Sequence, residues 1–368
     1  MGQLRANAVA AVAVVHLVVP DGIDDPMRPS GGNTYDRRVR DGLTALGWSV
    51  HEHAVPGNWP MPGAAARAGF AAVIAGIGDG CVVLVDGLIA STVPEALVPE
   101  ARRLRLAVLV HLPLGDTSPQ DGLVDAGARE QAVLSAAAAI VTTSAWTRRW
   151  LLDRYALRPD RVQVAEPGVD AAALATGSAT GDELLCVAAV TPNKGHDVLL
   201  AALATVMDLP WRCVCVGSVN RDPGFVGRLD RQARAHGIDD RVCFAGARTG
   251  ADLDSHYAAA DLLVLASRAE TYGMVVTEAL ARGLPVVATA VGGLPDALGR
   301  TPDGSRPGML VRPGDSAAFA AALRRWLTDT ELRRRLRSAA QERRVTLSGW
   351  STTSLRISRI LADLGHHG

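Results

Sequence analysis

Two glutamates with seven residues between them are the most informative acidic side chains in the sequence. Glu270 follows an apolar run typical of a buried strand, and Glu278 falls within the helix expected next. Gly273 opens that helix, so the backbone N–H groups of Gly273, Met274 and Val275 are free to bind a phosphate. Glu278 could accept hydrogen bonds from vicinal hydroxyls such as those of a ribose, and Glu270 could reach another hydroxylated group across the phosphates. By themselves, two acids at this spacing are more often solvent-exposed or helix-capping side chains.

Four further residues could contact a phosphorylated ligand or the group attached to its phosphates. Lys194 is the only lysine of the chain, and it lies after a predicted strand and before Gly195 and a predicted helix, where a lysine can hold phosphate. Gly31 and Gly32 follow the first predicted strand, and glycines there permit a close approach of the backbone, although an ordinary turn remains open. His111 ends another predicted strand, where it could face a ligand or be purely structural.

Short apolar runs alternate with helical stretches along nearly the whole chain. Runs of Val, Ile and Leu without alternation fit parallel strands buried on both faces, and their repetition with helices predicts a doubly wound α/β sheet. The pattern restarts after the small, polar stretch 171–181. The sequence therefore predicts two tandem Rossmann-like domains that face a central cleft.

The expected strands are Val12–Val19, Ser49–His53, Cys81–Asp86, Leu106–Val110, Ala139–Thr142, Val162–Ala165, Leu184–Val190, Arg212–Val216, Val242–Phe244, Leu262–Ala266, Val286–Thr289 and Met309–Val311. The expected helices are Asp36–Leu46, Val93–Arg103, Gly127–Ala137, Ala145–Tyr155, Val198–Val206, Gly224–His236, Leu253–Ala259, Met274–Arg282, Ala317–Leu327 and a helical stretch Leu332–Leu364 that breaks near Ser348.

The composition excludes several classes of protein. The 368 residues include 38 Lys+Arg, 38 Asp+Glu and 4% aromatic residues, so neither a global positive field nor base-stacking surfaces favour nucleic acid. The apolar run Ala8–Val19 is too short to span a bilayer and lacks a cleavage-site pattern, so we expect a buried strand rather than a signal peptide. The five cysteines, all in predicted buried strands, fit a reducing compartment, and we expect a cytoplasmic protein.

Segment 267–289 resembles the corresponding part of the retaining glycosyltransferases of the GT-B fold, family 4. Their hallmark is a pair of glutamates with the spacing of Glu270 and Glu278. Loop 190–195 looks like the family's loop ending in Lys-Gly, and 166–170 looks like its segment at the domain junction. Further agreement lies in Gly273, Ala281-Arg-Gly-Leu-Pro-Val-Val-Ala, Val291-Gly-Gly293, Gly308, Val311, Pro313-Gly-Asp315 and the segment around Trp350, and the resemblance covers roughly the whole chain.

This resemblance implies a GT-B enzyme with an acceptor-side domain 1–170, a nucleotide-sugar domain 171–345 and a C-terminal helix, 346–368, that crosses back to the first domain. The implied activity is a retaining, metal-independent hexosyl transfer from a UDP- or GDP-type sugar to an acceptor hydroxyl, which could belong to a small molecule or a lipid-linked one. No cofactor is expected besides the nucleotide-diphosphate sugar as co-substrate.

The resemblance also implies roles for individual residues. Lys194 is expected to hold the diphosphate, Glu270 to orient the transferred sugar, and His111 to contact that sugar from the first domain. Glu278 is expected to bind the ribose of the donor. The complete set of expected donor-binding residues is Gly31, Gly32, Arg221, Arg268, Thr271, Tyr272, Gly273, Met274, Val275 and Glu278.

The sequence departs from the family pattern at one position that matters for the chemistry. The family usually carries an arginine five residues before the loop lysine, and here that position is Ala189. Loss of one preorganised donor can cost about 3 kcal/mol of transition-state stabilisation, so we expect Arg221 or Arg268 to substitute. Pro167 stands where the family has asparagine. Two alternatives stay open: a nucleotide-sugar epimerase on the same fold, and a sugar-nucleotide-binding protein with degenerate catalysis.

Two further motifs resemble a metal site and a membrane-contact site, but an ordinary structural role is favoured for each. Asp252-Leu-Asp254 has the spacing of a metal-binding DxD motif, but it lies where acids stabilise a helix start, so no metal site is expected. Trp146-Thr-Arg-Arg-Trp150 could touch a membrane, although an ordinary surface helix is favoured. Any membrane contact is therefore expected to be peripheral at most.

Overall fold

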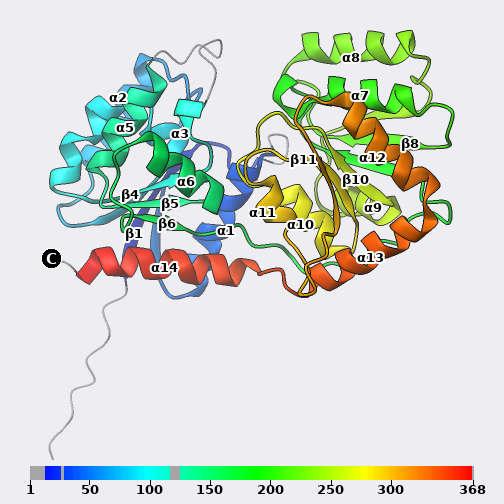
Figure 1. Ribbon diagram of the computed structural model, residues 1–368. Coiled ribbons are helices and arrows are strands. Elements are labelled where there is room, and N and C mark those ends of the chain that lie inside the picture. The colour runs from blue at the N-terminus through cyan, green and yellow to red at the C-terminus, as the bar shows by residue number, and fades with distance from the viewer. Residues whose placement is uncertain (1–12, 26–28, 117–124, 367–368) are drawn as a thin grey trace, which may run out of the picture.

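The structure is a computed structural model that describes residues 13–25, 29–116 and 125–366. It consists of two α/β halves joined by two chain crossings (Figure 1). Each half is built on a parallel six-stranded sheet with helices on both faces. The fold class expected from the sequence is therefore confirmed.

The first sheet has the strand order β2-β1-β3-β4-β5-β6, and every pair is parallel. Its strands are runs of aliphatic residues because both faces are covered, and separate apolar clusters lie on its two sides. The strands are β1 (Val14–Pro20), β2 (Ser49–Val55), β3 (Val82–Asp86), β4 (Arg105–Val110), β5 (Ala139–Thr142) and β6 (Val162–Val164).

The second sheet has the order β12-β11-β10-β7-β8-β9, again entirely parallel. One continuous apolar cluster surrounds it. Cys243, expected to be buried, is exposed on the edge strand β9, because an edge strand lacks one neighbour to cover it. The strands are β7 (Glu183–Val187), β8 (Arg212–Val216), β9 (Val242–Gly246), β10 (Leu262–Leu265), β11 (Val286–Thr289) and β12 (Gly308–Val311).

Helices follow nearly every strand. In the first half they are α1 (Gly31–Ala45), α2 (Ala64–Ala75), α3 (Gly87–Ala90), α4 (Pro94–Leu97), α5 (Ala126–Ala136) and α6 (Ala145–Arg154). In the second half they are α7 (His196–Thr205), α8 (Pro223–Ala235), α9 (Gly250–Ala259), α10 (Met274–Ala281), α11 (Leu294–Leu298), α12 (Ser316–Thr328) and α13 (Thr330–Arg344), and the last helix of the described chain is α14 (Trp350–His366).

Helix α14 returns from the second half and lies along the first (Figure 1). The two crossings run side by side, since the Val169 N–H donates to the Ser348 carbonyl at 3.0 Å. A Cβ at Gly168 would overlap the backbone of Trp350, so a glycine is needed where the chains cross. Buried Ile357 and Leu361 then anchor α14 to the first sheet.

Two of the expected helices differ clearly from the structure. The single helix expected over Val93–Arg103 is wrong, because Pro99 divides it into α4 and a 3-10 turn, Pro99–Arg102. Helix α1 begins at Gly31 and not near Asp36, because Ser30 caps it by accepting a hydrogen bond from the Asn33 N–H at 3.0 Å. Gly31 and Gly32 are therefore the first residues of a helix and not a loop.

Among the described residues, no helix combines the length and the apolar character that crossing a bilayer requires.

Candidate active site

The strand order brings two distant loops together in the second half. Strand β7 lies between β8 and β10, so the loops that follow β7 and β10 leave the sheet in opposite directions at a topological switch point. Open α/β sheets bind ligands in the crevice formed there. The loop after β7 carries Lys194, and the loop after β10 carries Glu270. The topology therefore explains why residues 76 positions apart share one site.

Lys194 and Glu270 are in direct contact. The Lys194 Nζ lies 2.5 Å from the Glu270 Oε2, and both side chains are partly exposed, by 25% and 17%. Because water reaches both groups, a ligand can separate them without stranding a buried charge. The only lysine and the first glutamate of the motif thus face one another, and both are accessible to solvent.

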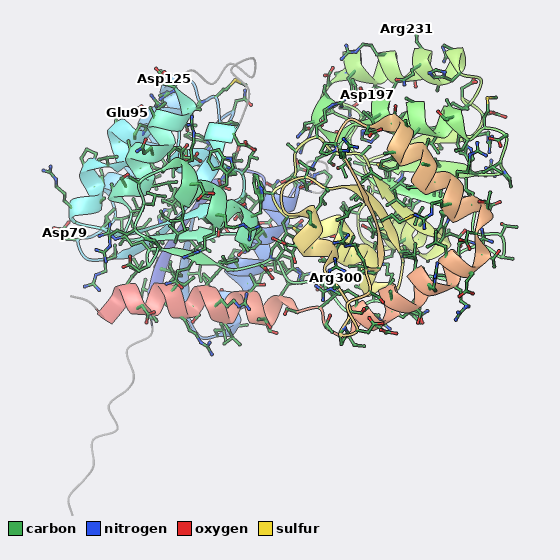
Figure 2. The ribbon with its side chains drawn as sticks, viewed as in Figure 1. Asp79, Glu95, Asp125, Asp197, Arg231 and Arg300 are labelled. Atoms are coloured by element: carbon green, nitrogen blue, oxygen red, sulfur yellow. The ribbon has the colours of Figure 1, made fainter. Side chains whose placement is uncertain are left out.

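The Lys194 loop is locked to the neighbouring strand. Gly195 has a φ of +67°, and a Cβ there would overlap the carbonyl oxygen of Ala266. Arg268 donates to the Pro192 carbonyl at 2.6 Å and pairs at 2.6 Å with Asp197, which is labelled in Figure 2. Arg268 therefore braces the lysine loop instead of being an unengaged cation at the donor site.

The Glu270 loop rests on a pair of glycines. The Gly293 N–H donates to the Glu270 carbonyl at 3.0 Å, and a Cβ at Gly292, whose φ is +56°, would overlap that same carbonyl. Gly293 likewise packs against the backbone of Thr271. This close approach fixes the backbone that leads into α10.

Helix α10 begins directly after this loop. Gly273 is its N-cap with a φ of +94° and provides no side-chain cap, so the first N–H groups, including those of Met274 and Val275, are not satisfied by a capping side chain. Such a helix start attracts an anion through its free donors and its dipole. Tyr272 is buried beside it and supports the turn.

Glu278 lies within α10 and is held by the helix that precedes β10. The Tyr257 hydroxyl donates to the Glu278 Oε2 at 2.8 Å, and the Arg282 guanidinium lies 4.5 Å from the Tyr257 ring centre. Burial raises the pKa of the Glu278 carboxyl, against the hydrogen bond from Tyr257 and the charge of Arg282. One carboxylate of the motif is thus fixed in place, whereas Glu270 is exposed enough to move.

The first half presents a second helix start to the same place. A Cβ at Gly31 would lie 3.5 Å from the Met274 sulfur, so the start of α1 faces the start of α10 across the two halves. A Cβ at Gly32 would lie 3.6 Å from the His111 ring. The structure therefore brings Gly31, Gly32, Met274 and His111 together, as one ligand spanning both halves would require.

His111 lies between two carboxylates that the sequence analysis missed. Its Nε2 is 2.8 Å from the Asp36 Oδ1 and 3.8 Å from the Asp86 Oδ2. Burial opposes the charged ring, but the charge and hydrogen bond of Asp36 and the charge of Asp86 raise the pKa of His111 to about 9. Asp86 ends strand β3, a position that could have identified it, whereas nothing in the spacing of Asp36 points to His111, 75 residues away.

The two arginines expected to replace the family arginine are both engaged elsewhere. Arg268 pairs with Asp197, as described above, and Arg221 donates to the Pro29 carbonyl of the first half at 3.3 Å. Neither contact places a guanidinium beside Ala189. Lys194 is the side-chain cation that pairs with Glu270.

Two groups among the described residues bring three potential metal ligands within 4.8 Å of one another. One is the cluster of Asp36, Asp86 and His111. The other, Cys186, His196 and Cys215, is buried in the apolar core of the second half. Asp254 of the DxD lookalike instead pairs with Arg282, so that motif is part of the packing of α9 against α10.

Comparison with known proteins agrees with this geometry. The profile of the family "Glycosyl transferases group 1" matches residues 177–343. D-inositol 3-phosphate glycosyltransferase from Kineococcus radiotolerans is 34% identical over 248 residues, which are 61% of this chain and 57% of that protein. D-inositol 3-phosphate glycosyltransferase 1 from Catenulispora acidiphila is 31% identical over 299 residues, 76% of this chain and 68% of that protein. The chain spans between half and two thirds of the length of several such relatives.

Solved structures share the architecture. Sucrose-phosphate synthase from Thermosynechococcus elongatus superposes with a TM-score of 0.78 at 22% identity, covering 96% of this chain and 99% of that one. Anabaena Alr3699/HepE in complex with UDP and glucose superposes with a TM-score of 0.74 at 19% identity, covering 95% and 100%. At these identities the likeness concerns the fold.

Proposed function

The chain belongs to the glycosyl transferases group 1 family and has the GT-B fold; from that premise we propose that it is a retaining glycosyltransferase that moves a sugar from a nucleotide-diphosphate sugar to an acceptor hydroxyl. The observation that carries the proposal is the meeting of Lys194, Glu270 and the start of α10 at the switch point of the second sheet. A cation and a helix start suit a diphosphate, and a carboxylate beside them suits sugar hydroxyls.

The donor would replace the contacts that the protein makes with itself. Its diphosphate would take Lys194 from Glu270 and extend over the N–H groups of Gly273 and Met274. Glu270 would then accept hydrogen bonds from the transferred sugar, and Glu278, already fixed by Tyr257, would accept those of the ribose. Each charge would keep a partner throughout, which a partly buried site requires.

The same groups suit the chemistry of leaving-group departure. Charge grows on the diphosphate as its bond to the anomeric carbon breaks, so a preorganised cation and helix start stabilise the transition state more than the ground state. In front-face attack, the acceptor oxygen bonds to the anomeric carbon and its proton passes to the departing phosphate oxygen. No metal is required in this proposal, because Lys194 and α10 supply the positive field.

The names of the relatives suggest which donor and acceptor classes to test first. Since one structural neighbour binds UDP and glucose, a UDP-type donor is the first to test, with a GDP type next. Since sequence relatives are named for D-inositol 3-phosphate, a phosphorylated cyclitol is the first acceptor to test, bound by the first half.

Calorimetric titration with UDP and GDP tests the donor site without knowledge of the acceptor. We expect one of them to bind, and Lys194→Ala and Glu278→Ala each to weaken it, whereas a substitution at the exposed Asp41 leaves it unchanged. Absence of binding by any nucleoside diphosphate would refute the proposed function. Binding without release of nucleoside diphosphate from any donor would favour the degenerate alternative.

A further inference from the structure

The cluster around His111 holds two buried carboxylates and an imidazole in the wall of the first half. Asp36 comes from α1, Asp86 is the last residue of β3, and His111 follows β4. The two aspartates are 1% and 3% exposed, so water does not screen them. A buried charge is stable only when it is paired, so the packing around the cluster determines which of its groups carry protons.

The charge balance favours a proton on the ring. Asp36 contacts the Nε2 of His111 at 2.8 Å and Asp86 approaches it at 3.8 Å, and both raise the pKa of His111. Burial and the charge of Asp36 raise the pKa of Asp86 as well, so Asp86 retains a proton more readily than an exposed carboxyl. A proton is therefore held within the cluster, and the contacts of both carboxyl groups with Nε2 place it on the His111 ring.

Tyr35 is a further titratable neighbour of the ring. The Tyr35 ring stands edge-on to His111 with 5.1 Å between ring centres, its hydroxyl donates to the Ala165 carbonyl at 2.7 Å, and burial raises its pKa. Gly32 of α1 also faces the ring and brings no side chain against it. Among the described residues, the titratable groups in contact with His111 are Asp36 and Tyr35 of α1 and Asp86 of β3.

The second ring nitrogen of His111 is unoccupied. Within residues 13–25, 29–116 and 125–366, its Nδ1 makes no hydrogen bond, and the side chain is 11% exposed beside the start of α1. A protonated ring offers an N–H at this nitrogen, whereas a neutral ring that donates through Nε2 to Asp36 would offer a lone pair. The carboxylates thus decide whether His111 gives or takes a proton at the ligand.

We propose that Asp36 and Asp86 are positioning residues that keep His111 a hydrogen-bond donor through both ring nitrogens, so that it binds an oxygen of the transferred sugar and is not the base for the acceptor hydroxyl. This inference rests on the proposed function of the site. It leaves the departing phosphate oxygen as the group that receives the acceptor proton.

A titration of His111 by NMR, together with the pH profile of kcat/KM, tests this inference. In the wild type we expect the His111 signals, assigned by their loss in His111→Gln, to titrate near pH 9 and activity to fall through the same range. Asp36→Asn should lower both midpoints by more than one pH unit and leave the affinity for nucleoside diphosphate unchanged. Asp41→Asn, on the exposed side of the same helix, should change neither.

Several results would overturn the inference. A wild-type His111 that titrates near its ordinary value, or an activity that rises as His111 loses its proton, would make the ring a base. An Asp36→Asn midpoint equal to the wild type would remove Asp36 from the account, and Asp86→Asn provides the same comparison if Asp36→Asn does not fold. Broadening of the His111 signals by micromolar Mn²⁺, reversed by chelator, would show a cation where we place a proton. The NMR titration needs no substrate. If His111 titrates as expected but the protein shows no turnover, the result contradicts the proposed function and not the charge assigned to His111.

Discussion

Lys194 and Glu270 form an ion pair, with 2.5 Å between Nζ and Oε2, that joins the loops following β7 and β10. The carboxylate expected to bind the sugar is thus paired with the cation expected to bind the diphosphate. A bound donor would compete with this ion pair, because its diphosphate would bind Lys194 and its sugar would bind Glu270. Donor binding must therefore exchange one ion pair for another, and this exchange has measurable consequences.

The first prediction follows from that competition. Glu270→Gln frees Lys194, so the affinity for nucleoside diphosphate should rise several-fold while the rate of sugar transfer falls. Lys194→Ala should lower kcat by about 100-fold, near 3 kcal/mol, and lower donor affinity less, because the leaving diphosphate gains charge in the transition state. Calorimetry and saturation kinetics on both variants measure these effects. Equal losses of nucleoside diphosphate affinity in the two variants would contradict the competition.

A second prediction concerns Glu278, which Tyr257 holds at 2.8 Å. Glu278→Ala should weaken nucleoside diphosphate by about 1–3 kcal/mol, the usual cost of leaving buried polar partners unpaired. A ligand without the ribose 2′- and 3′-hydroxyls should bind the wild type less tightly by a similar amount, and the variant should not distinguish the two ligands. If the variant still prefers the hydroxylated ligand as the wild type does, Glu278 does not bind the ribose.

The third prediction compares two glycines with nearly equal φ in the same half. Gly195 (φ +67°) faces the carbonyl of Ala266, whereas Gly237 (φ +63°) has nothing within 4 Å of a Cβ. Gly237→Ala should cost about 1 kcal/mol of unfolding free energy, from backbone strain alone. Gly195→Ala should cost at least ~2 kcal/mol more, because the added methyl must displace the backbone. Denaturant unfolding measures both, and equal costs would show that the lysine loop is not locked to β10.

The fourth prediction is a pH dependence of stability. The pKa of His111 is raised from 6.5 to about 9 in the folded state, and that of Asp86 is raised as well, so the folded protein binds more protons than the unfolded chain. The His111 contribution is fully present below pH 6.5 and is lost as the pH rises through about 9. The unfolding free energy should therefore fall over this range in the wild type, and fall less in His111→Gln/Asp86→Asn, which lacks both groups. Parallel curves for the two proteins would contradict the charge state assigned to the cluster.

The strands were predictable because this fold buries them on both faces. Uninterrupted runs such as Val82–Asp86 and Leu262–Leu265 cannot be amphipathic helices of useful length, so composition alone identifies them. Helix α2 was missed because all but one of its residues, Arg67, are small or apolar, so it shows no clear helical period, and Gly63 offers no capping side chain. Helix α11 was missed because five residues with a proline show no period.

The local placement of the acidic motif was predictable, and its partners were not. Glu270, Gly273 and Glu278 lie within one strand–loop–helix unit, so the sequence around them, and not their spacing alone, indicated that they lie together. Tyr257 and Asp36 reach their partners only through tertiary packing, across 21 and 75 residues. The structure also showed that Arg268 braces the lysine loop, which no spacing in the sequence indicates.

The central claim, retaining transfer from a nucleotide-diphosphate sugar without a metal, is tested most directly by ¹H NMR of a turnover reaction. The protein would be incubated in chelator with UDP- and GDP-sugars, with and without a phosphorylated cyclitol, while the anomeric protons are followed. We expect one donor to yield free nucleoside diphosphate and a glycoside with the donor's anomeric configuration, only when acceptor is present and at the same rate with or without chelator. A glycoside of inverted configuration, a nucleotide sugar epimerised without acceptor, or activity that disappears in chelator and returns with Mn²⁺ would contradict the account.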